Sequence, residues 1–199
     1  MIQLILASQS PQRKAMMDTL GLPYSILPAD IDELAITAPT QFERAALVAK
    51  GKGQKIRQTL LEQKQAQRFV VMAADTYVVD PSTNRALEKP TSIDEAREML
   101  AYQSGKTLEE YTGVYWFDSG ELEVSETIAT KVTFRTLSKS EIEKYITNEP
   151  VTTWSGAFCP AYDTGAALIA KIEGSFTGFT HGFPLEFFVP KLRSIGVIQ

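Results

Sequence analysis

The spacing of apolar residues changes several times along the chain, and each change predicts a new element of secondary structure. A short apolar run at 2–7 predicts a buried strand, and a helix is expected next at 11–20. After Thr40, apolar positions recur every three or four residues, and Thr40 with Glu43 has the pattern of a capping box, so a second helix starts there. The run at 68–79 is apolar almost throughout, which predicts a strand buried on both faces.

The second half of the chain continues the alternation of strands and helices. Strand-like segments at 109–118 and 121–136 meet at Ser119-Gly120, which predicts a β-hairpin. The remaining predictions are helices capped by Ser92 and Ser138, a loop at 148–165, a strand at 166–172, a loop after it, and a C-terminal helix from about Pro184. No repeat or break in composition divides the chain. The pattern predicts an α/β fold with a mixed sheet flanked by helices, in one two-lobed domain over residues 1–199.

Composition narrows the functional classes. The 199 residues are 44% hydrophobic with a formal net charge of −4, which argues against a nucleic-acid-binding module. No apolar stretch approaches the roughly 20 residues that span a bilayer, and the apolar start is too short for a signal peptide. The single cysteine excludes an internal disulfide. We therefore expect a soluble cytoplasmic protein with no membrane partner, in which a local cluster of cations holds any anionic substrate.

The single histidine also limits the chemistry. A site with several histidine ligands is impossible, so a divalent metal would be held by carboxylates and phosphates, which suits Mg²⁺ or Mn²⁺. Glu33, in an acidic loop, and Asp75, inside the apolar run, are the candidate ligands. Since an ionised carboxylate is costly to bury, Asp75 is expected at the C-terminal mouth of its strand as a ligand or base, or in a structural ion pair.

The segment SQSPQRKAMM places two cations at the start of the first helix. Ser10 and Pro11 are a good N-cap and first-turn pair, but Arg13 and Lys14 follow where the helix dipole repels each by ~0.3–1 kcal/mol. A strand, a loop with the hydroxyls of Ser8 and Ser10, and a helix N-terminus form a common phosphate-binding arrangement. The alternative is an ordinary turn in which Ser10 caps the helix and both cations are solvated.

Two lysines are further candidates. Lys52 lies between two glycines on the apolar stripe of the second helix, so its ammonium group can reach an anionic ligand or extend from the edge of the stripe to water. Lys89 follows Glu88 after the turn that ends the long apolar run. It is either a substrate contact near Asp75 or a solvated turn charge.

These segments occur in an order that resembles the Maf family of nucleoside triphosphate pyrophosphatases. The resemblance covers nearly the whole chain, through LILASQSPQR, IDE, VAKGKG, AADT, LEKP, QSGKT, VTFRTLS, IEKYI, SGAF, IEGS and HGFPLE. It implies a twisted mixed sheet akin to that of inosine triphosphatases, with the site between two lobes. It further implies a homodimer, a divalent metal (Mg²⁺ or Mn²⁺), and hydrolysis of a nucleoside triphosphate between the α and β phosphates to a monophosphate and pyrophosphate.

The family motifs then assign roles by position. They imply catalytic roles for Asp75, Lys52, Lys89 and Arg13, substrate-binding roles for Ser8, Ser10, Gln12 and Thr76, and metal-binding roles for Glu33 and Asp75. Whether Asp75 is the base or a metal ligand stays open at this point. The rival hypothesis is a nucleotide-binding regulator of cell division without strong catalysis, but a vestigial site would have lost some of these charged residues.

The base preference is not defined by the motifs. Thr76 after the aspartate resembles the branch that acts on dTTP and UTP, whereas YTGVYWF resembles a branch that acts on a modified nucleotide, 7-methyl-GTP. Gln12 differs from both branches, and Ala161 takes the place of a glutamine or glutamate. The aromatic residues Trp154, Phe158 and Tyr162 are candidates either to stack on a base or to pack in the core. His181 is either a phosphate contact or a plain loop residue.

Overall fold

The structure is a computed structural model that describes residues 2–64, 66–120 and 122–198. Within these residues, the fold is built on a seven-stranded sheet with the order β2-β1-β3-β5-β6-β7, and β4 pairs with β3. The strands are β1 (Gln3–Leu6), β2 (Tyr24–Ile26), β3 (Phe69–Asp80), β4 (Arg85–Leu87), β5 (Thr107–Asp118), β6 (Leu122–Phe134) and β7 (Ile169–Glu173). The helices are α1 (Pro11–Thr19), α2 (Gln41–Glu62), α3 (Ile93–Gln103), α4 (Lys139–Asn148), α5 (Asp163–Ala166), α6 (Phe176–His181) and α7 (Leu185–Ser194), with 3₁₀ turns η1 (Val151–Thr153) and η2 (Ser155–Ala157).

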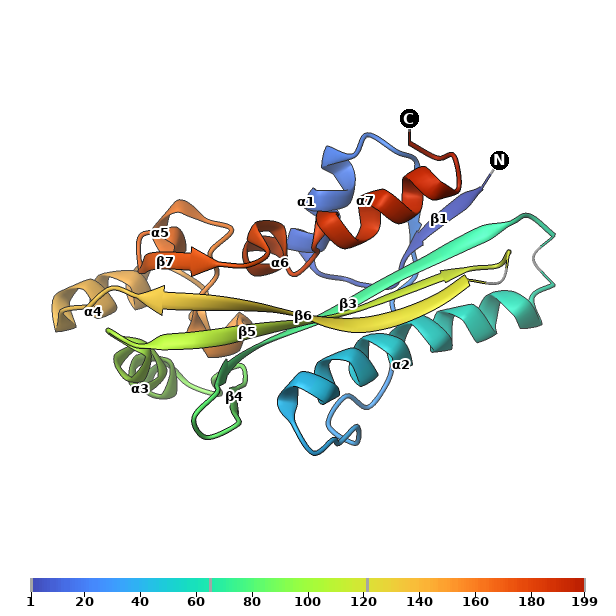
Figure 1. Ribbon diagram of the computed structural model, residues 1–199. Helices are drawn as coiled ribbons and strands as arrows, with labels where there is room; N and C mark the ends of the chain where they lie inside the picture. The colour runs from blue at the N-terminus through green and yellow to red at the C-terminus, as the bar shows by residue number, and fades with distance from the viewer. Residues whose placement is uncertain (1, 65, 121, 199) are drawn as a thin grey trace.

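The sheet mixes two kinds of pairing. β1 is parallel to β2 and to β3, whereas the pairs from β3 through β5 and β6 to β7 are antiparallel. The long strands β3, β5 and β6 run through both halves of the molecule (Figure 1). The predicted α/β fold with a mixed sheet flanked by helices is confirmed.

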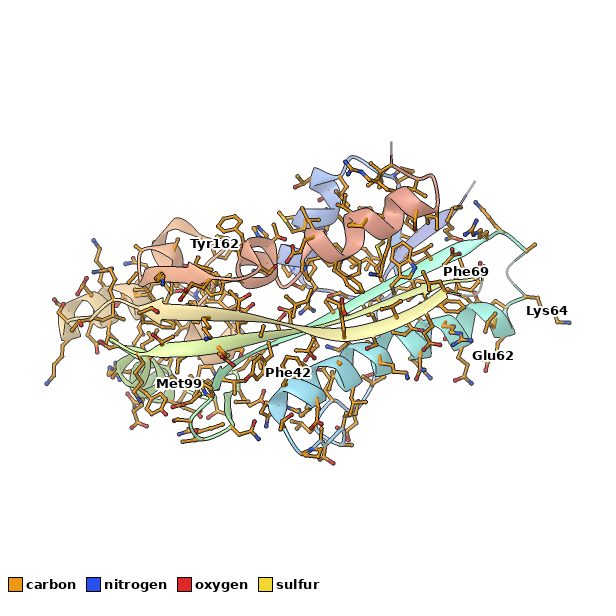
Figure 2. The ribbon with its side chains drawn as sticks, viewed as in Figure 1. Phe42, Glu62, Lys64, Phe69, Met99 and Tyr162 are labelled. Atoms are coloured by element: carbon orange, nitrogen blue, oxygen red, sulfur yellow. The ribbon has the colours of Figure 1, made fainter. Side chains whose placement is uncertain are left out.

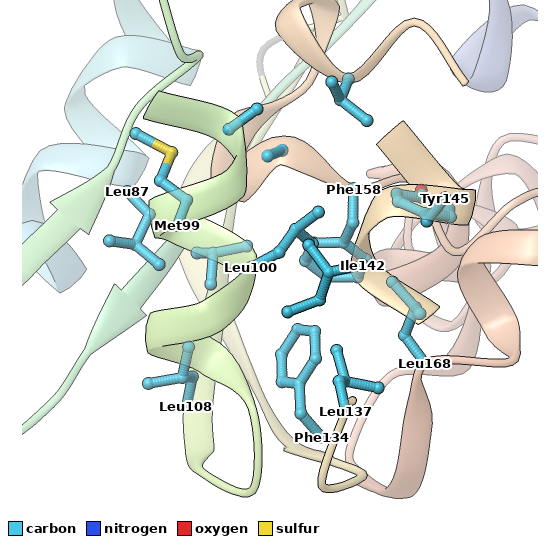
Figure 3. Packing of buried hydrophobic residues seen from close by; sticks show 14 of the residues in the cluster. Leu87, Met99, Leu100, Leu108, Phe134, Leu137, Ile142, Tyr145, Phe158 and Leu168 are labelled. Carbon is cyan, nitrogen blue, oxygen red and sulfur yellow. The ribbon is translucent and has the colours of Figure 1, made fainter. Parts of the chain in front are cut away.

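Each half has its own apolar core. In one half, α2 packs on one face of the sheet through residues such as Ala49 and Ile56, and α1 and α7 cover the other face through Met17 and Phe188 (Figure 1). In the other half, α3 and α4 pack with β5 and β6 around Phe134 (Figure 3). The cores therefore hold the two ends of β3 and leave its middle for polar side chains.

Several local predictions are confirmed. The capping boxes of α2 at Thr40 and of α4 at Ser138 both form, and Ser92 caps α3. The β5–β6 hairpin also forms, although Glu121 of the predicted strand lies outside the described residues. Among the helices described, none combines the length and the apolar character needed to cross a membrane. The prediction of one domain over residues 1–199 stays a prediction.

Other local predictions are wrong. The loop expected after β7 contains α6, which Ser175 caps by accepting from Gly178 N and which ends at Gly182 in the left-handed region, φ 61°. The expected loop at 148–165 contains two 3₁₀ turns and the start of α5. The strands β2 and β4 were not predicted. All these elements are too short to show a period in the sequence.

Candidate active site

The site lies where one edge of β3 lacks a strand partner. β1 pairs with β3 only as far as Met72, and β4 pairs with it only from Val78 onward. In the described part of the chain, residues 73–77 are paired on the β5 side alone. A cleft of about 1290 Å³ opens along this gap, and side chains from both faces of β3 line it. All predicted site residues line this one cleft: Ser8, Ser10, Gln12, Arg13, Glu33, Lys52, Asp75, Thr76 and Lys89.

Asp75 does not lie at the end of the strand, where the sequence predicted it. This residue lies in the middle of β3, five residues before the strand ends at Asp80, and not at the C-terminal mouth. It reaches the cleft because neither β1 nor β4 covers this part of the edge. Since side chains alternate along a strand, Asp75 points to the α2 face and Thr76 to the face that carries α1 and α6.

On the α2 face, three charged side chains form an ionic cluster. Lys52 Nζ donates to Asp75 Oδ1 at 2.5 Å and lies 2.9 Å from Glu33 Oε1. Lys52 is 8% exposed and Asp75 is 6% exposed, so both charges are largely withdrawn from water. Removing one partner of such a buried pair strongly destabilises the folded protein, because the other charge is left unpaired. Lys52 is therefore an inward-facing residue and does not extend to solvent.

Two glycines allow α2 to come close enough for this contact. Gly113 pairs with Asp75 across the β3–β5 ladder, and a Cβ there would lie 1.8 Å from the carbonyl oxygen of Ala45. A Cβ on Gly53 would lie 1.9 Å from the ring of Tyr115. Larger residues at either position would push α2 away from the sheet and Lys52 away from Asp75.

Arg44 holds the acidic loop against α2. Its guanidinium donates to the carbonyl oxygens of Ile36 at 2.9 Å and Glu33 at 3.2 Å, and to Glu88 Oε1 at 3.2 Å. The ring of Tyr77 lies under it, with 4.9 Å from Cζ to the ring centroid. One buried arginine thus connects the loop that carries Glu33 with the segment that leads to Lys89.

On the opposite face, Arg13 connects the N-terminal loop to β3. It donates to Ser8 Oγ at 3.2 Å, to Thr76 Oγ1 at 3.2 Å and to the carbonyl oxygen of Gly182 at 3.0 Å. Ser10 caps α1 as predicted, by accepting from Arg13 N. Burial lowers the pKa of Arg13, and the charges of nearby carboxylates, Asp75 first, oppose that shift. The guanidinium is held by neutral acceptors, which leaves its charge available to an anion.

The far wall of the cleft is aromatic and uncharged. Gln12 Nε2 donates to Tyr162 OH at 3.5 Å and to Cys159 Sγ at 3.7 Å. Trp154 and Tyr162 lie with ring centroids 5.6 Å apart, and Figure 2 shows Tyr162 on the side of the sheet that carries α1 and α6. All three aromatic candidates line the cleft: Phe158 is also buried in the core, and Trp154, which packs against that core, contacts Tyr162.

A left-handed turn positions this wall. Gly156 and Ala157 have φ values of 67° and 63°, and Gly156 N donates to the carbonyl oxygen of Glu88 at 3.2 Å. Gln103 Nε2 donates to the carbonyl oxygen of Gly156 at 2.6 Å. The same turn therefore fixes the aromatic wall and the segment of Lys89, which is exposed and lines the cleft.

The structure also places Lys14 and His181, whose roles the sequence left open. Lys14 forms an exposed ion pair with Asp18 at 2.7 Å and does not line the cleft. His181 lines the cleft at the end of α6, with Nδ1 2.7 Å from Thr180 Oγ1, and burial lowers its pKa. It lies at the end of a helix and is not a loop residue.

The chemistry of the donors fits a divalent metal. Asp75 Oδ2 is buried, and in the described part of the structure it accepts no hydrogen bond. Glu33 contacts the same Lys52 ammonium group as Asp75. The described residues contain no group of three metal-binding side chains. Two carboxylates with open positions are what Mg²⁺ uses when substrate phosphates complete its coordination.

Two buried charged residues were not recognised in the sequence as parts of the site. Arg44 looks like an ordinary helix cation, and only its burial shows that it connects two loops. Glu110 of β5 is buried and lines the cleft, and a charged residue within a strand at EEYTGVYWF was an available signal for it. The sequence contained that signal, but without the pairing to β3 it did not indicate which face Glu110 takes.

Comparison with known proteins identifies the family. A model of Maf-like proteins matches residues 3–195, and the chain belongs to this family. The chain is 37% identical over 199 residues to a dTTP/UTP pyrophosphatase of Moorella thermoacetica, covering 99% of this chain and 97% of that one. It is 33% identical to a dTTP/UTP pyrophosphatase of Treponema denticola, covering 94% and 93%. The family expected from the sequence motifs is confirmed.

A solved structure, a HAM1 protein from Coxiella burnetii, is a more distant match. It is 16% identical, with a TM-score of 0.43 over 67% of this chain and 73% of that one. A likeness this weak does not bear on the site.

Proposed function

We propose that this protein is a nucleoside triphosphate pyrophosphatase that cleaves between the α and β phosphates to release a monophosphate and pyrophosphate. The observation that carries the proposal is the Lys52–Asp75–Glu33 cluster, which faces the same cleft as Arg13 and Lys89. In such an arrangement the carboxylates can hold a metal ion or accept a proton from water, and the cations can bind phosphate. Its full-length relatives, named dTTP/UTP pyrophosphatases, support this reaction.

The cations stabilise the charge of the polyphosphate. Arg13, Lys52 and Lys89 offset the charge that develops on the phosphate oxygens and on the leaving pyrophosphate, which is the main source of catalysis in phosphoryl transfer. Ser8 and Ser10 add hydroxyl donors beside the N-terminus of α1, where the helix dipole also attracts an anion. The two cations at the start of α1 then have different roles, with Arg13 in the site and Lys14 in solvent.

Asp75 and Glu33 are the proposed holders of a Mg²⁺ or Mn²⁺ ion. When bound, such an ion polarises phosphate oxygens and neutralises part of their charge. Asp75 Oδ2 has free acceptor capacity, so it serves either as the metal ligand or as the base that takes a proton from the attacking water. Lys52 fixes the orientation of the carboxylate in both cases.

The proposed substrates are dTTP and UTP. The relatives of this name from Moorella thermoacetica and Treponema denticola match the chain over 97% and 93% of their length, and Thr76 follows the aspartate as in the pyrimidine branch that the motifs resemble. Gln12, Thr76 and the aromatic wall are the proposed contacts of the nucleoside. The homodimer, the cytoplasmic location and the absence of nucleic-acid partners remain predictions.

A panel of canonical and modified nucleoside triphosphates with Mg²⁺ or Mn²⁺ tests the proposal. We expect equal amounts of monophosphate and pyrophosphate, with the highest kcat/KM for dTTP and UTP. Release of inorganic phosphate alone would assign a different hydrolase reaction. Nucleotide binding without any product would favour the regulatory alternative.

A further inference from the structure

Glu110 is a buried carboxyl group for which the proposed reaction has no use. It is 4% exposed, and it lines the cleft from β5. Thr112 Oγ1 donates to Glu110 Oε1 at 3.3 Å, a long hydrogen bond. Within the described residues, no lysine or arginine nitrogen lies within 4.0 Å of this carboxyl. Burying a carboxyl with so little compensation costs stability, and such a group in a cleft is a candidate for ligand binding.

Its position separates Glu110 from the ionic cluster. Glu110 pairs with Val78 across the β3–β5 ladder, so its side chain lies on the face of Thr76, opposite to that of Asp75. The hydroxyl groups of Thr76 and Thr112 lie 3.4 Å apart between Arg13 and Glu110. Lys52 lies on the opposite face of β3, and among the described residues no cation pairs with Glu110, so this part of the cleft suits the uncharged nucleoside end of a ligand whose phosphates lie with Arg13 and Lys52.

The surroundings of Glu110 at that end suit a flat, uncharged group. Cys159 lies near Glu110, and burial raises the pKa of its thiol. Gln12 joins Cys159 to Tyr162, and Tyr162 packs with Trp154. This corner of the cleft therefore combines an aromatic surface, on which a base can stack, with two polar side chains, Gln12 and Glu110, that can form hydrogen bonds to the edge of the base.

We propose that Glu110 determines the base specificity of this site by pairing with the imide edge of uracil or thymine, the N3–H group beside the O4 carbonyl. The assignment rests on the proposed function, and it places base recognition on β5, outside the motifs that carry the catalytic residues.

The protonation state of Glu110 supports this pairing. Burial raises the pKa of Glu110 well above its usual value, and the hydrogen bond from Thr112 and the charge of Arg13 only partly oppose it. A neutral carboxylic acid has one O–H donor and one carbonyl acceptor. The carbonyl accepts from N3–H while the O–H donates to O4, so both groups of the imide edge are satisfied. An ionised carboxylate would repel O4.

The test compares UTP with 3-methyl-UTP, in which the N3–H group is replaced. We expect the wild-type protein to prefer UTP in kcat/KM by about 10- to 100-fold, the usual range for one bidentate contact to a base edge. Glu110→Ala should bring the ratio close to unity by slowing UTP alone. Glu110→Gln should keep most of the preference, because an amide has the same donor and acceptor pair as a neutral acid.

Glu109→Ala is the matched control. Glu109 is the neighbouring carboxylate on β5, its side chain accepts from Tyr111 OH at 2.5 Å on the α2 face, and it does not line the cleft. We expect it to keep the wild-type ratio. The inference is overturned if Glu110→Ala keeps that ratio or slows both nucleotides equally.

The two proposals fail separately. A wild-type protein that releases pyrophosphate from other nucleoside triphosphates, but from neither UTP nor dTTP, would overturn the role of Glu110 and leave the reaction in place. A protein that hydrolyses no triphosphate would overturn the proposed function itself.

Discussion

The two faces of β3 carry opposite kinds of chemistry only one residue apart. Asp75 points to α2 and enters an ionic cluster with Lys52 and Glu33, in which charges neutralise one another. Thr76 points to α1 and α6, where Arg13 is held by hydroxyl and carbonyl oxygens and Glu110 is weakly compensated. The first face is built around ion pairs, and the second around hydrogen bonds in which the acceptors are neutral oxygens.

The difference separates reaction from recognition. Charges that pair before the substrate arrives are oriented in advance, which is the condition for strong electrostatic catalysis. Neutral donors and acceptors instead discriminate among ligands, because a wrong partner leaves a buried polar group unsatisfied. Substitutions in the Asp75 cluster should therefore affect kcat, whereas substitution of Glu110 should affect the choice of base.

Asp75→Asn tests the first face with the largest expected effect. Removing the charge leaves the shape of the side chain, and kcat should fall by roughly 10³-fold, within the usual range for loss of a general base. Activity is measured as pyrophosphate release, and circular dichroism checks the fold. Asp80→Asn is the control, because Asp80 is a buried carboxylate on the same strand that lies outside the cleft. Near-normal turnover by Asp75→Asn would refute its catalytic role.

Lys52→Met separates two functions of the ionic cluster, catalysis and metal binding. Without the ammonium group, kcat should fall about 100-fold, as for loss of one charged donor to a transition state. Mn²⁺ should bind more tightly, since Lys52 no longer competes for the oxygens of Asp75 and Glu33. Calorimetry measures the metal affinity, and Lys55→Met, an exposed lysine on the same helix, is the control. Unchanged or weaker metal binding would contradict the proposed metal ligands.

Arg44→Lys tests whether the first face depends on its supporting loops. A lysine keeps the charge but cannot donate to Ile36, Glu33 and Glu88 together, so kcat/KM should fall roughly 10-fold through misplacement of Glu33. Steady-state kinetics measure the effect. Arg57→Lys, which changes a more exposed pair with Glu123 on the same helix, should have little effect. Equal losses in both variants would mean that Arg44 has no special positioning role.

Glu110→Gln has the smallest expected effect, and it concerns stability. The pKa of Glu110 is higher in the folded state than in the unfolded state, so folding favours the protonated form. The free energy of unfolding therefore decreases as the pH rises from the unfolded pKa of about 4.3 toward the folded one. The amide does not titrate, so at about pH 8 the variant should be more stable by roughly 1–3 kcal/mol, the cost of an uncompensated buried group.

Urea unfolding at several pH values measures this difference. It should shrink toward zero below about pH 4, where the wild-type carboxyl is protonated in both states. A variant less stable than the wild type at alkaline pH would show that Glu110 is well compensated, and would remove the stability cost that motivates its role.

Much of the fold was predictable because its signals are local. The caps at Thr40, Ser92 and Ser138 depend on residues three positions apart, and the long apolar run of β3 is visible in the sequence. The short elements β2, β4 and α6 were missed, since three to six residues cannot show a period and their stability comes from pairing and packing. The candidate site residues were recognisable by charge in apolar surroundings or by family motif, but not their contacts.

The sequence by itself determined the kinds of groups available: an aspartate within an apolar run, a lysine on the apolar stripe of a helix, a hydroxyl-rich helix start and a family pattern. Only the tertiary structure decided how they meet. The cleft opens at the gap between β1 and β4, where Asp75 lines it in mid-strand, and Gly113 admits α2 so that Lys52 reaches Asp75. The pairing of β5 with β3 puts Glu110 on the face of Thr76, opposite to that of Asp75. Such contacts join residues far apart in the chain, so no local pattern of amino acids records them.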